Sequence, residues 1–382
     1  MHAAPEFLQN LALVLCVAAV TTVVFQKLRQ PVVLGYLLAG MVVSPYTPLP
    51  FFADQKATQT LSELGVILLM FSLGLEFSLS RLFRAGARAV FVGVVQCSVM
   101  LWLGYLTATL FGWTALEGIY AGAIIAISST TIIVKAFEEQ RVRGRLTDLV
   151  FGVRVIEHII AIFLIAVLTA VSTGGDVSAA SLGGTAARLG AFLVAMLVVG
   201  MLLVPRSMRM IVRLGRPETT VVASVGLCFA FALIAHVAGY SVALGAFLAG
   251  ALVGESGVEH EVEERVQPVR DVFAAIFFVA VGMLIDPALI VQHWRAVLVF
   301  TLVGVGGKVG AVAVAVFLTG QGIRLSVKAG MSLAQIGEFS FIIASVGLAL
   351  GAVGDFLYPV AVAVSAVTTL LTPWLIRASD PV

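Results

Sequence analysis

The sequence predicts an all-α, polytopic membrane protein with about thirteen transmembrane helices, and three observations predict it. Of its 382 residues, 60% are hydrophobic and 12% are charged, about half the charged share of a soluble domain, and the mean hydropathy is +1.09. Apolar stretches follow one another along the whole chain with short polar turns between them. Short motifs in the first half return in the second half, which predicts an internal repeat.

The apolar stretches can be marked in order along the chain. They lie at about 7–25, 32–44, 60–78, 88–111, 116–136, 149–171, 185–204, 219–238, 240–254, 271–285, 294–318, 327–350 and 356–376. The first is followed by Lys27 and Arg29 and has no small-residue cleavage site, so we interpret it as a membrane span rather than a signal peptide. We expect residues 1–382 to form a single transporter domain without a soluble domain, enzyme activity or cofactor, and the acidic run 255–264 to be a cytoplasmic loop.

The basic residues of the loops test the orientation. With the N-terminus outside and the C-terminus in the cytoplasm, eighteen Lys and Arg residues lie inside, three lie outside and two lie within spans, which accounts for all 23. This is a strong positive-inside signal. The basic residues are scattered and the net charge is only +2, so we expect the lipid bilayer and no nucleic acid as a partner.

The repeat joins the second stretch to the ninth. Leu34–Gly40 reads L-G-Y-L-L-A-G, and Leu244–Gly250 reads L-G-A-F-L-A-G, 210 positions later. Gly74 precedes Gly282 by 208 positions in the following stretches. The offset of seven helices is odd, so the two halves, at about 31–171 and 240–376, have inverted topology, with the helices at about 185–238 linking them. Inverted repeats are typical of secondary transporters, whose site lies at the midplane between the halves.

The candidate site is centred on the stretch 149–171, which holds Arg154, Glu157 and His158. An ionisable group at the bilayer centre costs at least ~2.5 kcal/mol, so such groups usually face a bundle interior or a water path and mark a transport site. A purely structural pair of Arg154 and Glu157, one helical turn apart, is the alternative.

Polar residues interrupt two further spans at the same depth. Ser128, Ser129, Thr130 and Thr131 lie midway along the fifth span, and the offset maps them near Gln335 and Glu338 in the twelfth. Such interruptions suit unwound helices that face an ion, and serine and threonine back-bonding in intact helices is the alternative.

Lys308, midway along the eleventh span, requires a carboxylate partner. We predict a contact between Glu157 and Lys308 in at least one state, with Arg154 turned toward the cytoplasmic interface, and Glu338 is the alternative partner of Lys308.

Six motifs carry a resemblance to a known family. They are Q-P-V-V-L-G-Y-L-L-A-G at 30–40, G-L-E at 74–76, S-S-T-T-I-I-V-K at 128–135, L-G-A-F-L-A-G at 244–250, F-F-V-A-V-G-M at 277–283 and L-A-Q-I-G-E-F-S-F at 333–341. The chain resembles the Kef-type branch of the monovalent cation/proton antiporters over nearly its whole length.

The resemblance implies a homodimer in a bacterial inner membrane, in which each subunit has the fold of the sodium/proton antiporters, with two crossed broken helices. These would be the fifth and twelfth spans. Members of the family exchange K⁺ or Na⁺ for H⁺ by an elevator movement. We therefore assign the cation and proton site to Glu157, His158, Ser128, Ser129, Thr130 and Lys308, supported by Arg154, Thr131, Gln335 and Glu338, with no metal beyond the transported cation.

The chain departs from the family pattern in two respects. The sixth-span pair of the family usually ends in Asp, and here it is Glu157-His158. Imidazole titrates near pH ~6.5 and is cationic when protonated, so it cannot attract a cation as a carboxylate does. Either the chemistry has moved to Glu157, or transport is altered, or position 158 carries a substitution. Second, many relatives continue into a nucleotide-binding regulatory domain, which we expect to be absent after Val382.

Two other functions remain open at the level of sequence. One is a transport-impaired regulator or sensor in which His158 responds to pH. The other is a channel-like uniporter that passes the cation without a counter-proton.

Overall fold

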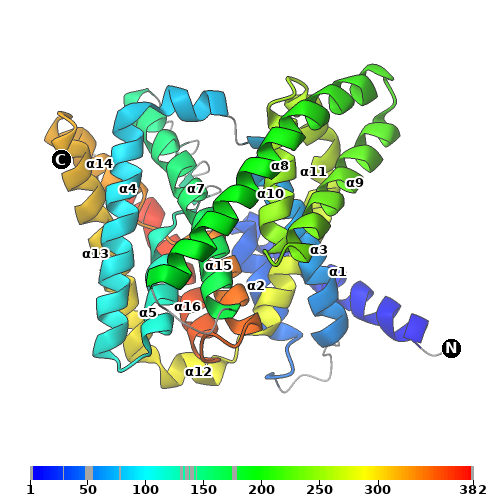
Figure 1. The fold of residues 1–382 in the computed structure, drawn as a ribbon. Helices are drawn as coiled ribbons and strands as arrows, with labels where there is room; N and C mark the ends of the chain where they lie inside the picture. The colour runs from blue at the N-terminus through cyan, green and yellow to red at the C-terminus, as the bar shows by residue number, and fades with distance from the viewer. Residues whose placement is uncertain are drawn as a thin grey trace. The chain divides into compact units, whose positions relative to one another are not determined.

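A computed structural model of the chain describes residues 3–28, 30–47, 55–76, 79–129, 132–133, 137, 142, 144–173 and 179–379. This part of the chain contains fifteen helices (Figure 1). They are α1 (Ala3–Lys27), α2 (Val32–Val42), α3 (Gln55–Glu76), α4 (Leu79–Leu110), α5 (Ala115–Ala126), α7 (Arg145–Thr173), α8 (Ala179–Arg213), α9 (Pro217–Val237), α10 (Val242–Gly254), α11 (Glu259–Met283), α12 (Pro287–Gln292), α13 (Trp294–Leu318), α14 (Ile323–Ser332), α15 (Glu338–Ala349) and α16 (Leu357–Ala378).

The apolar helices correspond to the thirteen predicted stretches. Among the described residues, eight helices are long and apolar enough to cross a membrane, and five shorter apolar helices account for the other stretches. The all-helical membrane fold is therefore confirmed. One boundary was wrong: α11 begins at Glu259, so the second half of the predicted acidic loop forms the first turns of a long helix. Acidic side chains at a helix N-terminus are favoured by the helix dipole, which explains why this run is helical.

The chain divides into two compact units. The first consists of Met1–Leu79 and Thr169–Ile285, and the second of Ser80–Leu168 and Asp286–Val382. Each unit therefore combines one segment from each half of the sequence. All the predicted site residues fall within the second unit.

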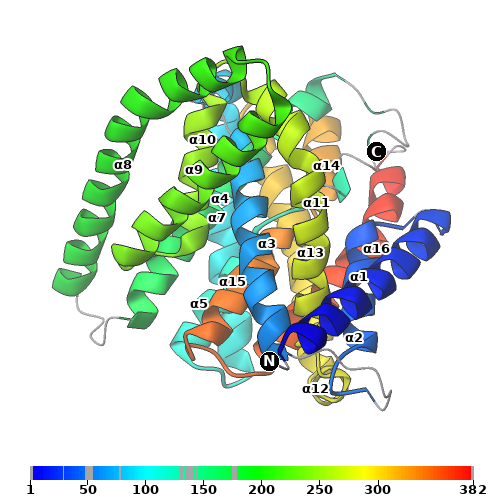
Figure 2. The same ribbon diagram turned by 90° about the vertical axis from the view of Figure 1, so that its right-hand side faces the viewer.

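In the first unit, α2, α3, α10 and α11 pack against one another, and Figure 2 shows α3 and α11 side by side. Two glycine pairs bring their backbones together. A Cβ atom on Gly40 would lie 2.6 Å from Gly282 Cα, and one on Gly74 would lie 2.9 Å from Gly250 Cα. Small residues allow this close approach, which stabilises helix contacts in membranes. The repeat relates Gly40 to Gly250 and Gly74 to Gly282, so each pair is the counterpart of the other.

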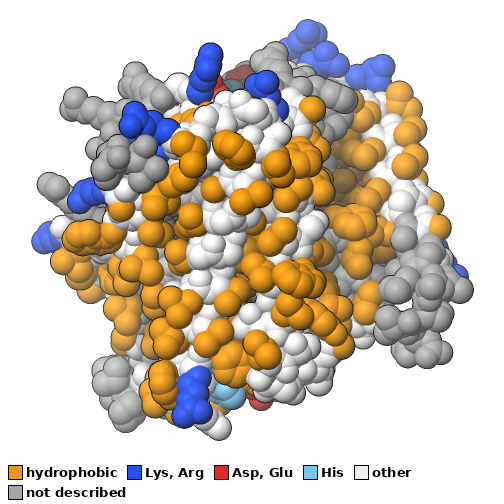
Figure 3. Space-filling view, turned by 90° about the vertical axis from the view of Figure 1, so that its left-hand side faces the viewer, with side chains coloured by type: hydrophobic (Ala, Val, Ile, Leu, Met, Phe, Trp, Pro, Cys, Tyr) orange, Lys and Arg blue, Asp and Glu red, His pale blue; other side chains and the backbone are white. Residues whose placement is uncertain are grey.

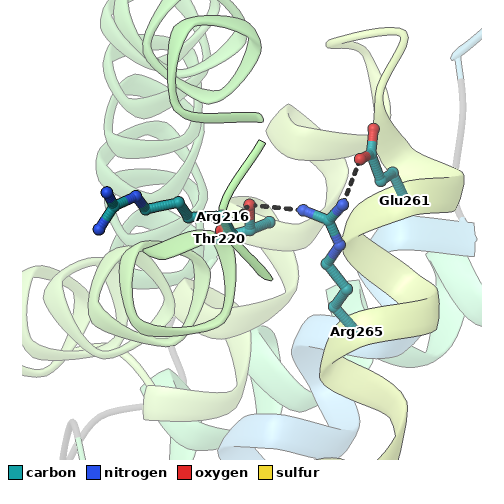
Figure 4. A network of polar contacts seen from close by, with 4 residues as sticks. All are labelled: Arg216, Thr220, Glu261 and Arg265. Atoms are coloured by element: carbon teal, nitrogen blue, oxygen red, sulfur yellow. Dashed lines mark hydrogen bonds and ion pairs between the residues drawn. The ribbon is translucent and has the colours of Figure 1, made fainter. Parts of the chain in front are cut away.

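A polar network holds the first turn of α9 against α11 in the same unit (Figure 4). Arg265 forms an ion pair with Glu261, one turn before it on α11, and donates a hydrogen bond to Thr220 Oγ1 at 2.8 Å. Arg216, at the N-terminus of α9, points away from this network. The Arg265 side chain is therefore bonded to other residues of the first unit.

In the second unit, a cluster of buried apolar side chains joins α4, α7, α13 and α14. It includes Val92, Val153, Val312 and Ala329. Gly104 of α4 faces Gly122 of α5, where an added Cβ atom would lie 2.3 Å from Gly122 Cα. On the face drawn in Figure 3, hydrophobic side chains are spread over the middle and the Lys and Arg side chains lie near the edges, as expected for a surface in contact with lipid.

Candidate functional site

The first break lies at the end of α5. The helix begins with a capping box, in which Thr114 Oγ1 accepts a hydrogen bond from Glu117 N–H and the Glu117 carboxylate accepts one from Thr114 N–H. It ends at Ala126, and Ile127 has extended dihedral angles, with φ −99° and ψ 131°. Serines follow at once, and their hydroxyls compete with helical hydrogen bonding. The predicted interruption of this span is therefore present.

The carbonyl groups that this break exposes are bonded by other elements. Gln96 of α4 donates its amide N–H to Ala126 O at 2.8 Å, and Gly337 N–H donates to Ile127 O at 3.0 Å. A helix end buried away from water needs such partners, because its last carbonyls have none within the helix. Gln96 is fully buried, so its role is to fix the end of α5.

The second break separates α14 from α15. Residues between Ser332 and Glu338 are not helical, and α16 binds both polar groups of Ile336. Ile336 N–H donates to Thr368 Oγ1 at 3.2 Å, and Ser365 Oγ donates to Ile336 O at 3.1 Å. The two hydroxyls replace the helical partners that Ile336 has lost.

The two breaks touch each other. The Gly337 N–H bond to Ile127 O links them, and a Cβ atom on Gly337 would lie only 2.5 Å from Ser128 O. Only glycine fits at this position without moving the backbone. The I-G-E sequence thus allows the two non-helical stretches to pack directly against each other.

Glu157 of α7 points its carboxylate at the first break. The side chain is 0% exposed, and its Oε2 accepts from Ser128 N–H at 2.9 Å while Oε1 lies 3.0 Å from Ser128 Oγ. Ser128 Oγ also lies 3.0 Å from Leu333 O. A hydroxyl has one proton, so Ser128 donates to one of these acceptors at a time.

Lys308 of α13 approaches the same hydroxyl. It is 0% exposed, and its Nζ donates to Ser128 Oγ at 3.1 Å and to Gln335 O at 2.8 Å. Among the described residues no ion pair within 4 Å joins Lys308 to Glu157. Ser128 lies between the two charges and is bonded to both. A direct contact in another state stays a prediction.

The alternative partner, Glu338, bonds elsewhere. Its Oε2 accepts from Ser129 Oγ at 2.8 Å. Gln335, which is fully buried, donates its amide N–H to Ser129 O at 3.3 Å. Ser129 is thus held from both sides by residues of the second break.

The expected position of Arg154 was wrong. We predicted that it turns toward the cytoplasmic interface, but its side chain is only 3% exposed and its Nη2 lies 2.7 Å from His158 Nε2. These residues are one turn apart on α7, so the contact follows the helix surface. A guanidinium can only donate, so His158 Nε2 is an unprotonated acceptor here. The His158 ring also packs against Phe339, with centroids 4.8 Å apart.

Three site residues were not predicted from the sequence, namely Gln96, Ser365 and Thr368. The sequence feature that could have identified them is a polar residue within an apolar span. For serine and threonine this feature is only weak evidence of a site. Two predicted residues, Thr130 and Thr131, lie outside the described residues. Within the described part of the chain, no cluster of three or more His, Cys, Asp or Glu residues could hold a metal ion.

The fold and the site together define the class of protein. A buried carboxylate, a buried ammonium and two touching helix breaks lie within one membrane unit, which is the arrangement of a secondary transporter of small ions. The chain belongs to the sodium/hydrogen exchanger family, because the profile of its transmembrane domain matches residues 12–377. It is of the cation:proton antiporter-2 type, a group of transporters rather than enzymes.

Several relatives are similar over almost the whole chain. YbaL of Escherichia coli (strain K12), whose name as a cation/proton antiporter is provisional, is 37% identical over 92% of this chain and 64% of its own length. K(+) efflux antiporter 5 of Arabidopsis thaliana is 30% identical over 97% of this chain and 66% of its own. The chain therefore spans about two thirds of the length of these relatives. The Na(+)/H(+)-K(+) antiporter GerN of Bacillus cereus is 28% identical over 97% of this chain and 96% of its own.

A solved structure supports the fold. The sodium proton antiporter MjNhaP1 of Methanocaldococcus jannaschii superimposes with a TM-score of 0.79, covering 98% of this chain and 97% of that one, at 14% identity. At this identity the likeness concerns the fold alone. The predicted sodium/proton antiporter fold is confirmed.

Proposed function

We propose that this protein exchanges a monovalent cation, K⁺ or Na⁺, for protons across the membrane by alternating access. One observation carries the proposal: the buried Glu157 carboxylate meets the break after α5 and shares the Ser128 hydroxyl with Lys308. Family membership and the names of the relatives support antiport of these ions.

Competition at one anionic site accounts for exchange. A proton or an alkali cation neutralises Glu157, and Lys308 balances it when neither is bound. A lone charge at the midplane costs several kcal/mol, whereas a balanced site loses much of that penalty. Only occupied or balanced states therefore cross the membrane, and each crossing couples one ion to the other.

Ser128 links the carboxylate to the ammonium in this scheme. While Lys308 donates to Ser128 Oγ, the hydroxyl proton is free to point toward Glu157. When a cation replaces the ammonium, it finds the same hydroxyl oxygen and the Gln335 carbonyl that Lys308 had used. Oxygen ligands of this kind suit alkali cations, and they do not distinguish Na⁺ from K⁺. The likeness to Kef-type proteins and to K⁺ efflux antiporters favours K⁺.

The Arg154–His158 contact supports placing the ion chemistry on Glu157. A histidine that accepts from a guanidinium presents no negative charge to a cation. The same contact also favours the second candidate, a regulatory role, because protonation at His158 Nε2 would turn an attraction into a repulsion between two cations. The charged groups that couple electrostatically to Arg154 include Glu157 and Lys308.

The remaining parts of the proposal concern the assembly. We place the N-terminus outside and the C-terminus in the cytoplasm of a bacterial inner membrane, as the loop charges favour. The unit that contains the site would move relative to the other unit in an elevator cycle, within a homodimer, as the family likeness implies. The repeats at about 31–171 and 240–376 would give the inward and outward forms their symmetry.

Proteoliposomes that contain a pH-sensitive dye test this function. A K⁺ or Na⁺ gradient should drive proton movement in the wild type, and Glu157→Gln should abolish it. Glu117→Gln, at the far end of α5, is the matched control and should retain exchange. No cation-driven proton movement at any pH from about 5.5 to 9 would exclude exchange. Currents that follow the cation gradient and ignore the pH gradient would show a uniporter, and a conformational response without flux would show a sensor.

A further inference from the structure

The side-chain oxygen of Gln335 has no hydrogen-bond partner among the residues that the structure describes. Gln335 lies in the break between α14 and α15 and is 0% exposed. Its side-chain oxygen, Oε1, is buried and receives no hydrogen bond from any residue that the structure describes. Buried acceptors without donors are few in native proteins, and each calls for an explanation such as a bound ion or water.

The orientation of the Gln335 amide follows from its neighbour. The other amide atom lies 3.3 Å from Ser129 O, and a carbonyl oxygen can only accept. The nitrogen must therefore face Ser129, so the oxygen faces away from it. Exchanging the two atoms would place two oxygens against each other and is excluded by repulsion.

The neighbouring oxygens are already engaged. Both Glu157 oxygens contact Ser128, and Glu338 Oε2 accepts from Ser129. Lys308 Nζ donates to the backbone oxygen of Gln335, so a positive charge already lies against this residue. Gln335 therefore offers a cation two oxygens, one held by the lysine ammonium and one unused.

From these contacts we propose that Gln335 Oε1 is a direct ligand of the transported alkali cation. This inference rests on the proposed exchange function and deepens it. An amide oxygen is a neutral, hard ligand that binds Na⁺ or K⁺ but is not protonated near neutral pH. It therefore adds affinity for the cation without adding affinity for the competing proton. An effect on the affinity for the cation without an effect on the affinity for the proton therefore distinguishes a cation ligand from a residue that only supports the fold.

Two variants test the proposal with two readouts. Gln335→Met keeps the length of the side chain and removes the oxygen, and Gln335→Glu keeps the oxygen and adds a negative charge. The KM for K⁺ and for Na⁺ is measured in proteoliposomes at fixed pH. The rise in melting temperature on adding KCl or NaCl to the purified protein, against choline chloride at equal ionic strength, reports binding without transport.

We expect Gln335→Met to raise the KM of the preferred cation by about tenfold or more and to remove the salt-specific rise in melting temperature. The proton dependence of exchange, measured at saturating cation, should change little. Gln335→Glu should lower the KM of the same cation. The control is Glu117→Gln at the opposite end of α5, where the Glu117 carboxylate accepts from Thr114 N–H and Gly354 N–H. It should lower stability and leave the KM within about twofold.

The outcomes separate this inference from the proposed function. If the wild type performs no exchange, the proposed function fails. If the wild type performs exchange and Gln335→Met keeps the wild-type KM and salt response, only the inference fails, and the oxygen binds a water. If Gln335→Met does not fold, Gln335→Glu decides, because an unchanged KM in that variant also overturns the inference.

Discussion

The link between Glu157 and Lys308 through Ser128 predicts a measurable coupling. The two bonds measure 3.0 and 3.1 Å and share Ser128 Oγ, and no ion pair forms within 4 Å, so the charged atoms lie more than 4 Å and at most 6.1 Å apart. At an effective dielectric constant of ~20, opposite charges at this distance attract by about 3 kcal/mol. Glu157→Gln removes this attraction and one acceptor for Ser128, which should cost about 3–5 kcal/mol in total.

A double-mutant cycle measures the coupling. The melting temperatures of the wild type, Glu157→Gln, Lys308→Gln and the double variant give the four corners. For a chain of 382 residues, 1 kcal/mol corresponds to roughly 1 °C, so the double variant should melt about 3–4 °C above the additive expectation. Exchange should remain absent in both proteins that carry Glu157→Gln.

The control cycle pairs Glu157→Gln with Glu117→Gln. Glu117 lies at the opposite end of α5, where it binds Thr114 and Gly354 N–H, so these losses should add. Losses that also add for Glu157 and Lys308, within about 0.5 kcal/mol, would refute the coupling through Ser128. The same cycle repeated with Ser128→Ala shows whether the hydroxyl carries the interaction.

Three further predictions follow from single contacts. Gly337→Ala should abolish exchange and lower the melting temperature, because its Cβ atom would lie 2.5 Å from Ser128 O; wild-type transport by this variant would show that the breaks need not touch. Thr368→Val should lower the free energy of unfolding by about 1–3 kcal/mol in thermal melting, because Ile336 N–H loses its acceptor. Thr368→Ser keeps the hydroxyl and should lower it less. Equal losses in both variants would contradict this reason. Gly74→Ala should destabilise the first unit, since its Cβ atom would lie 2.3 Å from a backbone oxygen of α10, and unchanged melting would argue against close helix packing there.

The internal repeat shows which part of the helix packing could be predicted from the sequence. The offset of the motifs at Leu34–Gly40 and Leu244–Gly250 predicted halves of opposite orientation. The contacts Gly40–Gly282 and Gly74–Gly250 join repeat-related glycines in equivalent pairs, while the opposite orientation of the halves stays a prediction. The glycines could be located from the sequence, but their partners could not. Partner choice depends on how four helices pack, and no local pattern encodes it.

The sequence by itself determined the spans and the two polar interruptions, and it predicted the depth of Glu157 and Lys308. These features follow from hydropathy, because a long apolar run crosses the bilayer and a charged residue within such a run is easily recognised in the sequence. Only the tertiary structure decided which groups bond. Lys308 uses Ser128 and the Gln335 carbonyl, and Arg154 faces His158, since any nearby oxygen or nitrogen can satisfy a buried charge.

The tertiary structure also decided the supporting contacts. Gln96 and Thr368 bond backbone groups at the breaks, and the sequence gives no reason to choose them over other polar residues of the spans. The unused oxygen of Gln335 is likewise visible only in three dimensions. Hydrogen bonds depend on distances of a few tenths of an ångström between distant segments, whereas membrane insertion depends on average polarity along the chain.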